Sequence, residues 1–117
     1  MPAPLPYSPA VRAGDWLIVS GQIGVRDGAL VPGGFATEVD QVLDNLAAVL
    51  SANGAVRTDV VKCMVLLTDM ADFDEMNARY AAFFGDHRPA RSAFAVAALP
   101  RGAALEIEAW AYLGHDQ

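Results

Sequence analysis

The sequence predicts a single α+β domain over residues 1–117, built on a sheet that two helices cover on one face. Three observations predict this fold class. Residues 35–53 and 72–84 show helical apolar spacing, residues 60–67 are almost wholly apolar, and residues 89–113 hold two β-rich segments around a Pro-Arg-Gly break. The expected order of elements is β-β-(β)-α-β-α-β-β, with no internal repeat and no linker.

The N-terminal part predicts a short hairpin. Residues 7–20 contain two short apolar segments around a turn at residues 13–15, and the second segment ends at Ser20 and Gly21. Glycine permits a close approach of the backbone to a ligand or another chain segment. Spacing alone leaves Ser20 either a ligand contact or an ordinary hydroxyl at a strand end, and it favours the ordinary hydroxyl. A loop follows, with a possible short strand at residues 29–31.

The first helix is expected from about residue 35 or 37 to residue 53. Its apolar side chains recur every three or four positions, which gives one buried stripe. The stripe consists of Val39, Val42, Leu43, Leu46, Val49 and Leu50. The pair Asn53-Gly54 is a fitting helix end.

Residues 60–67 predict a central strand that scarcely alternates between apolar and polar positions, which indicates burial on both faces. Two helices can cover one face of the sheet, so we expect another copy of the protein to cover the other. The single cysteine, Cys63, lies in this run. It has no partner for an internal disulfide, and a buried small hydrophobe is expected there rather than a nucleophile.

The second helix is expected at residues 72–84 and ends at Gly85. Glu75 and Arg79 form an i,i+4 pair on its surface. For Asn77, spacing alone favours a solvated side chain over a functional one. The buried stripe is expected to hold Phe73, Met76, Tyr80, Phe83 and Phe84.

The closing stretch, residues 89–113, predicts an antiparallel hairpin. Because side chains alternate between the faces of a strand, one face is apolar and the other combines alanines with charges. The apolar face is expected to hold Phe94, Val96, Ala98, Leu105, Ile107 and Leu113. The other face is expected to hold Arg91, Ala93, Ala95, Glu106, Glu108 and Trp110.

The register of this hairpin leaves two interpretations of Arg91. A loop centred between residues 99 and 100 places Arg91 opposite Glu108 and makes Glu106 a diagonal neighbour, roughly 7–8 Å away. A small anion then fits against the guanidinium with the Glu106 carboxylate beside it. The alternative is a plain cross-strand ion pair between Arg91 and Glu108, and a one-residue slip separates the groups onto opposite faces.

Composition and charge narrow the class of protein. The chain is 54% hydrophobic and 19% charged, which is typical of a globular protein. The net charge of −6, without a basic cluster, argues against a nucleic-acid partner. No apolar run reaches the roughly 18–20 residues of a membrane span, and no export signal is visible. We therefore expect a cytoplasmic protein with no membrane partner. One cysteine and two histidines in unrelated contexts make no plausible metal set.

Motifs along nearly the whole chain resemble those of one family. They are Tyr7-Ser8, Ser20-Gly21-Gln22-Ile23, Gly33-Gly34, Val60-Val61-Lys62, Asp69-Met70-Ala71-Asp72-Phe73, Met76-Asn77 with Tyr80, Phe83-Phe84, Pro89-Ala90-Arg91-Ser92, Leu99-Pro100 and Glu106-Ile107-Glu108-Ala109. In this order and spacing, the chain resembles the Rid (YjgF-type) family, the reactive intermediate deaminases.

The resemblance implies a Rid/chorismate-mutase-like fold, in which two helices pack on one face of a mixed sheet. It also implies a homotrimer with ligand clefts at the subunit interfaces. The implied enzyme is a cofactor-independent, metal-free hydrolase of the 2-iminobutanoate/2-iminopropanoate deaminase type. It converts enamine and imine intermediates such as 2-aminoacrylate to a 2-keto acid and ammonia.

The resemblance also assigns roles to individual residues. Arg91 matches the arginine that binds the substrate carboxylate, and Glu106 matches the glutamate that positions the attacking water. Further residues at the substrate are Tyr7, Ser20, Asn77, the backbone of Gly21 and, beside Arg91, Ala93.

Two departures from the family pattern bear on substrate choice. Ala93 stands where the family often has cysteine, which removes a thiol and enlarges the pocket slightly. Pro9 stands where glutamine is usual. The alternatives are a deaminase of larger aminated carboxylates in a dedicated pathway, or a non-enzymatic trimer that binds small carboxylates, metabolites or proteins. A ribonuclease activity, also associated with the family, is disfavoured by the acidic charge balance.

Overall fold

The computed structural model describes residues 5–115. Its main α-helices are α1 (Phe35–Ala52) and α2 (Phe73–Phe84), with 3₁₀ turns at Arg57–Asp59, Met70–Asp72 and Pro100–Gly102. The strands are β1 (Ala10–Ala13), β2 (Trp16–Gln22), β3 (Val25–Arg26), β4 (Ala29–Leu30), β5 (Val60–Leu67), β6 (Ala90–Ala95) and β7 (Leu105–Tyr112).

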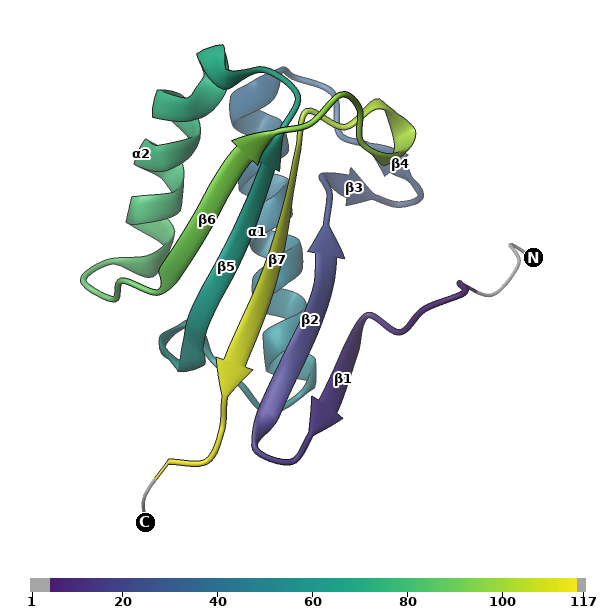
Figure 1. Cartoon of the computed structure of the whole chain (residues 1–117). Coiled ribbons are helices and arrows are strands. Elements are labelled where there is room, and N and C mark those ends of the chain that lie inside the picture. The colour runs from purple at the N-terminus through teal and green to yellow at the C-terminus, as the bar shows by residue number, and fades with distance from the viewer. Residues whose placement is uncertain (1–4, 116–117) are drawn as a thin grey trace.

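Five strands form one mixed sheet in the order β1-β2-β7-β5-β6. The pair β5–β6 is parallel and the other neighbouring pairs are antiparallel, while β3 and β4 make a separate small hairpin. Both helices lie on the same face of the sheet (Figure 1). The predicted α+β class, with two helices on one face of a mixed sheet, is confirmed.

The predicted helices are present with nearly the expected bounds. Helix α1 ends at Ala52 and turns its apolar stripe to the sheet, and α2 begins at Phe73, one residue later than expected. Gly85 ends α2 with a φ of 64°, a left-handed conformation that glycine adopts without steric cost. Within residues 5–115, neither helix is long and apolar enough to cross a membrane.

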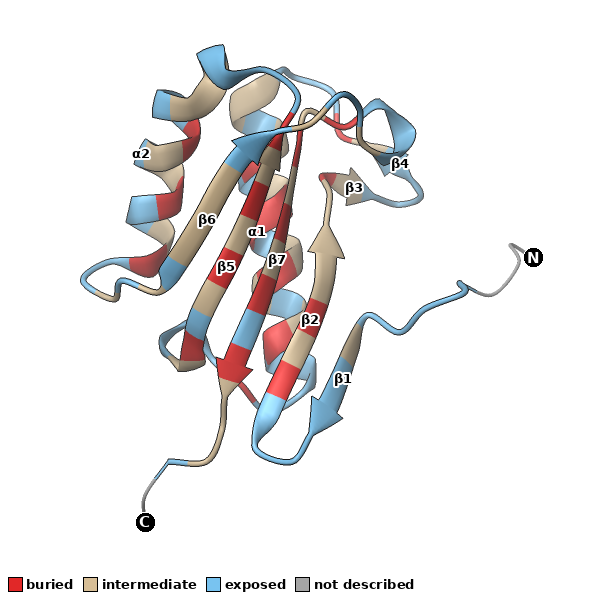
Figure 2. Ribbon diagram, in the orientation of Figure 1, coloured by how far each residue is buried: buried red, intermediate tan, exposed pale blue. Residues whose placement is uncertain are grey.

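The core lies between the helices and the sheet. Buried and half-buried positions alternate along β5 and β7 (Figure 2), so one face of each strand packs against the helices. Cys63 lies in this core with no exposed area, as predicted. The face away from the helices keeps large apolar side chains accessible, including Phe94 (46% exposed) and Trp110 (39%). Cover for this face by another copy stays a prediction.

The predicted closing hairpin is wrong. The strands β6 and β7 both exist, but β5 lies between them, and β6 pairs in parallel with β5. The reason is the connection: β5, α2 and β6 form a crossover unit, which is how parallel strands are joined. The segment from residue 96 to residue 104 then carries the chain past β5, with a 3₁₀ turn on the way.

The predicted sharing of faces in this region is also wrong. Arg91 and Ala93 are in register with the buried Cys63 and Val65 and therefore face the helices. Phe94 faces the open side instead. On β7, the even-numbered residues Glu106, Glu108 and Trp110 lie on the open face. Arg91 and Glu108 are thus on opposite faces, which rules out the ion pair between them.

Candidate functional site

Arg91 forms the cationic part of the candidate site. It lies half-buried on the edge strand β6, and its Nη1 donates a hydrogen bond of 2.7 Å to Asn77 Oδ1 on α2. Its guanidinium carbon lies 4.9 Å from the ring centroid of Tyr80 and 5.6 Å from that of Phe73. The ion pairs found within residues 5–115 involve Arg79 and His115, not Arg91. A half-buried cation without a carboxylate neighbour suits an anionic ligand.

Helix α2 holds this arginine with one face. Phe73, Asn77 and Tyr80 are spaced i, i+4 and i+7, so they point to the same side of the helix. That side faces β6, which places Asn77 against Arg91 and not fully in solvent. We call Arg91, Asn77, Tyr80 and Phe73 the cationic half-site. Ala93 follows on the same strand face and adds no polar group.

A cavity of about 290 Å³ opens beside the cationic half-site. Arg91, Asn77 and Tyr80 line it together with His87 and Arg88 from the loop that precedes β6. His87 Nε2 lies 2.6 Å from the carbonyl oxygen of Val60, and Arg88 donates to the carbonyl oxygens of Gly85 and His87. Both loop side chains are therefore tied to backbone carbonyls, whereas Arg91 is held by the side chain of Asn77.

Glu106 forms the anionic part, on the open face of β7. Burial raises the pKa of its carboxyl above the ordinary value, and the nearby carboxylate of Glu108 adds to the increase. The Glu106 side chain lies directly on the backbone of Gly21, because a Cβ built on Gly21 would be 2.2 Å from Glu106 Oε2. A side chain at this position would force the Glu106 side chain to move. We call Glu106 and Gly21 the anionic half-site.

The pairing of β2 is irregular next to this contact. Its register with β7 shifts between Val19 and Gln22, which is where Ser20 and Gly21 lie. Ser20 Oγ donates to the carbonyl oxygen of Ser8 over 2.7 Å, and Ser20 N donates to the carbonyl oxygen of Pro9 over 2.9 Å. Ser20 thus fastens the N-terminal segment to β2.

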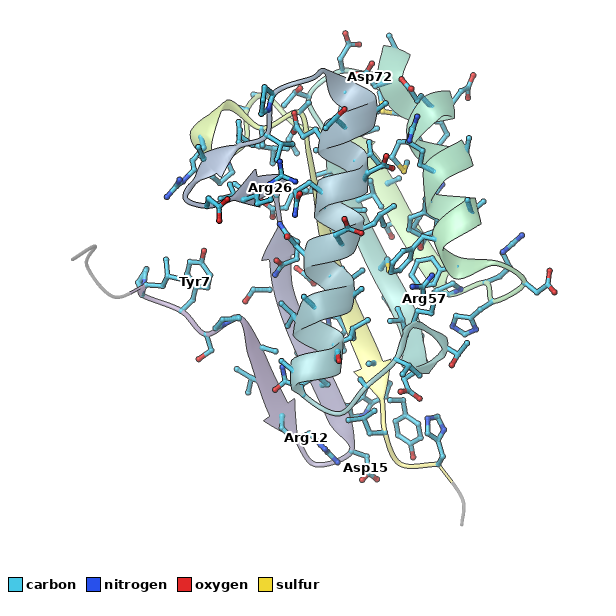
Figure 3. The ribbon with its side chains drawn as sticks, turned by 180° about the vertical axis from the view of Figure 1, so that it is seen from behind. Tyr7, Arg12, Asp15, Arg26, Arg57 and Asp72 are labelled. Atoms are coloured by element: carbon cyan, nitrogen blue, oxygen red, sulfur yellow. The ribbon has the colours of Figure 1, made fainter. Side chains whose placement is uncertain are left out.

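Tyr7 lies on that N-terminal segment. It is 57% exposed and lines a cavity of about 330 Å³ together with Gly21. Figure 3 shows Tyr7 on the opposite side of the molecule from α2. Tyr7 and Ser20 therefore lie near Gly21, which Glu106 contacts, and away from α2 and Arg91.

One chain does not bring the two half-sites together. Arg91 faces the helices and Glu106 faces away from them, and β5 separates their strands. The Arg91 guanidinium and the Glu106 carboxylate therefore lie on opposite faces of the same sheet.

Other groups complete the electrostatic description. Burial raises the pKa of the Cys63 thiol, which keeps it protonated and unreactive. In the part of the chain from residue 5 to residue 115, no group of three or more His, Cys, Asp or Glu side chains is arranged to hold a metal ion.

The sequence interpretation overlooked the aromatic part of the cationic half-site. Tyr80 and Phe73 were expected only as core residues, although their i, i+4, i+7 spacing with Asn77 was visible in the sequence. That spacing predicts that Asn77 points inward with the apolar stripe. No comparable signal marks Asn45 and Arg101, which line the cavity beside Tyr7 from distant parts of the chain.

Comparisons with known proteins identify the family of the chain. Residues 1–113 match the model of the family described as Endoribonuclease L-PSP. The mouse protein named 2-iminobutanoate/2-iminopropanoate deaminase is 48% identical over 111 residues, which cover 93% of this chain and 82% of the mouse protein. A RutC family protein of Pyrococcus horikoshii is 45% identical over 114 residues, covering 95% and 90% of the two chains.

Solved structures agree with the sequence matches. RidA from an Antarctic Psychrobacter superposes with a TM-score of 0.89 and 40% identity, covering 95% of this chain and 91% of that one. The TdcF structure from E. coli, solved with bound serine, superposes with a TM-score of 0.87 and 36% identity, covering 94% and 90%.

Proposed function

This chain belongs to the Endoribonuclease L-PSP (YjgF/Rid) family, and we propose that it hydrolyses reactive enamine and imine intermediates of the 2-aminoacrylate type to 2-keto acids and ammonia. The observation that carries the proposal is Arg91, half-buried, held by Asn77 at 2.7 Å and without a carboxylate neighbour among residues 5–115. The mouse and human relatives, at 48% and 47% identity, are named 2-iminobutanoate/2-iminopropanoate deaminase.

The separation of the half-sites supports a shared site between copies. Arg91 and Glu106 cannot face the same small substrate within one chain, because they lie on opposite faces of the sheet. We propose a homotrimer of single-domain chains. In each of its clefts, Arg91, Asn77 and Ala93 of one copy meet Tyr7, Ser20, Gly21 and Glu106 of a neighbour.

The chemistry needs only positioning and one acid–base group. The planar guanidinium of Arg91 receives the substrate carboxylate in a bidentate manner. The enamine takes up a proton at carbon and becomes an iminium ion, whose carbon is already electrophilic. Glu106 holds the water at that carbon and takes one of its protons as the C–O bond forms. Glu106 passes this proton to the nitrogen. The C–N bond then breaks with its electron pair going to ammonia, while the new hydroxyl group loses its proton to Glu106 and becomes the carbonyl of the 2-keto acid.

Ala93 favours a second candidate, a deaminase of larger aminated carboxylates, because its methyl group leaves space next to Arg91. A non-enzymatic carboxylate-binding trimer would use Arg91 equally well. The Glu106 carboxylate distinguishes these functions, because hydrolysis needs a group that positions water and binding does not.

The predicted cytoplasmic location stays a prediction.

A coupled assay tests the proposal. A serine or threonine dehydratase generates the enamine in situ, and its decay is followed with the parent protein, with Arg91→Ala and with Glu106→Ala. We expect faster decay with the parent, none above background with Arg91→Ala, and a larger loss of turnover than of carboxylate binding with Glu106→Ala. The control is Arg57→Ala, which removes another arginine stacked on an α2 ring, that of Phe83, away from the site.

The negative outcomes are specific. Equal turnover in Glu106→Ala and the parent contradicts the role of Glu106. A parent that binds carboxylates but accelerates no precursor supports the binding trimer. Acceleration confined to precursors larger than aminoacrylate supports the second candidate.

A further inference from the structure

The guanidinium of Arg91 lies against two aromatic rings of α2, those of Tyr80 at 4.9 Å and Phe73 at 5.6 Å. We propose that these rings, Tyr80 foremost, are positioning residues that hold the Arg91 guanidinium ready for the substrate carboxylate. The inference rests on the proposed function, because it assumes that Arg91 binds the carboxylate.

The geometry leaves most N–H donors of the Arg91 guanidinium available for a ligand. A guanidinium has five N–H donors, and Asn77 Oδ1 accepts from Nη1. A long side chain on an edge strand has many rotamers, and each must be restricted before a bidentate contact forms. A ring face attracts the cation without using any of its donors. The rings therefore restrict Arg91 while the remaining donors stay free for the carboxylate.

The ring of Tyr80, and not its hydroxyl group, provides this contact. The side chain is only 7% exposed, and its hydroxyl oxygen is buried beside the Cys63 thiol without a well-formed hydrogen bond among the described residues. Burial raises the pKa of Tyr80 far above its usual value, so the phenol stays neutral. A neutral phenol does not compete with the substrate carboxylate for Arg91.

The same helix offers a matched comparison. Arg57 lies over the ring of Phe83 at 4.3 Å and donates to the Phe83 carbonyl oxygen over 2.6 Å, near the C-terminal end of α2 (Figure 3). Phe83→Leu thus removes an arginine–ring contact from α2 without touching Arg91. It separates loss of a helix aromatic in general from loss of the ring under the proposed substrate-binding arginine.

The test measures binding of 2-ketobutyrate by calorimetry, together with kcat and KM in the coupled assay, for Tyr80→Leu, Tyr80→Phe, Phe73→Leu and Phe83→Leu. We expect Tyr80→Leu to bind about 5- to 30-fold more weakly, the effect of losing a desolvated cation–ring contact. KM should rise by a similar factor while kcat changes less. Phe73→Leu should shift in the same direction by a smaller factor, because its ring is farther from the guanidinium.

The conservative variant provides the rescue. Tyr80→Phe keeps the ring and should bind within about twofold of the parent, as should Phe83→Leu, even if the latter lowers thermal stability. Parent-like binding by a folded Tyr80→Leu overturns the inference, and so does a Tyr80→Phe as weak as Tyr80→Leu. If Tyr80→Leu does not fold, Phe73→Leu decides, and parent-like binding by that variant overturns the inference.

Arg91→Ala keeps the two proposals distinguishable. If Arg91→Ala still binds 2-ketobutyrate as the parent does, the proposed role of Arg91 is wrong, whatever the rings do. If Arg91→Ala loses binding and the ring variants keep it, only the positioning role is wrong.

Discussion

The cationic and anionic half-sites are built in different ways. Arg91 depends on side chains of α2, the helix that precedes its strand in the chain, through a hydrogen bond to Asn77 and two ring contacts. Glu106 depends on the backbone of the neighbouring strand, where its side chain occupies the space that a Cβ at Gly21 would need. The first half-site is a set of separable contacts and the second is a single steric fit. Substitutions should therefore weaken the first by degrees and disable the second at once.

Mixing two inactive variants should give the largest effect. If each cleft takes Arg91 from one copy and Glu106 from a neighbour, trimers reassembled from equal amounts of Arg91→Ala and Glu106→Ala regain clefts with both groups intact. About a quarter of the clefts should recover, because each of the two positions is intact in half of the copies. The coupled assay, run after the mixed chains are unfolded and refolded together, measures the recovery.

Each variant refolded alone is the control for this experiment and should stay inactive. A mixture that is as inactive as its components, in trimers shown by mass spectrometry to be mixed, would mean that one copy supplies both residues. Arg91 and Glu106 would then have to be reassigned.

Gly21→Ala should come next in size. The added methyl group cannot fit 2.2 Å from Glu106 Oε2, so the carboxylate must move from its position. We expect kcat to fall by about 10²-fold or more, in the range for a lost acid–base group. Binding of 2-ketobutyrate should change less than kcat, because the cationic half-site, which receives the carboxylate, is left intact.

A double-mutant cycle gives the control for Gly21→Ala. In a Glu106→Ala background there is no carboxylate to displace, so the added methyl group should cause little further loss of turnover. A full additional loss in the double variant would show that Gly21 acts through something other than Glu106.

Asn77→Ala should have a moderate effect on the cationic half-site. It removes the 2.7 Å hydrogen bond to Arg91 and leaves both rings in place. A hydrogen bond to a charged group contributes about 1.5–3 kcal/mol, so 2-ketobutyrate should bind at least roughly 10-fold more weakly. Asn77→Asp should bind more weakly than Asn77→Ala, because the new carboxylate competes for the guanidinium. The reverse order would contradict a carboxylate-binding role for Arg91.

The smallest expected effect is a pH dependence of the free energy of unfolding, caused by the protonation of Glu106. Its pKa in the folded protein is raised from the ordinary 4.5, so the native state holds a proton that the unfolded chain releases. Stability should therefore fall slightly as the pH rises from below 4.5 through the raised value. Glu106→Gln should remove this fall in chemical denaturation series.

The same titration should appear in turnover with the opposite sign. Glu106 acts as a base only when deprotonated, so kcat/KM should rise with pH through a pKa above 4.5. A parent profile that is flat across this range would contradict the assignment of Glu106 as the base.

The sequence was sufficient to predict the elements but not their pairing. Apolar spacing placed α1, α2 and β5 within a residue or so of their observed ends, because periodicity reports directly which side of an element is buried. It does not report which strand is the neighbour. The segments of β6 and β7 have compatible patterns, and the Pro100–Gly102 turn between them resembled a hairpin loop. The helix between β5 and β6 was the available sign of a parallel crossover.

For the site, too, the sequence predicted the residues but not how they are grouped in space. The motifs of the family identified Arg91, Glu106, Gly21 and Asn77 as a set, and the structure then placed Arg91 with Asn77 and Glu106 with Gly21. The division into two half-sites depends on strand order, which brings together residues far apart in the chain. Alternation of side chains alone could not predict this division. The prediction paired β6 with β7 instead of β5, and it therefore placed Arg91 and Glu106 on the same face.

The last strand of the chain, β7, occupies the middle of the sheet. Before residues 105–112 are synthesised, the β1–β2 ribbon and the β5–β6 pair have no strand to join them, and each keeps an unpaired edge. A nascent chain on the ribosome therefore cannot close its sheet until β7 has left the exit tunnel. Because Glu106 lies on β7, the insertion of this strand both completes the sheet and places the proposed base.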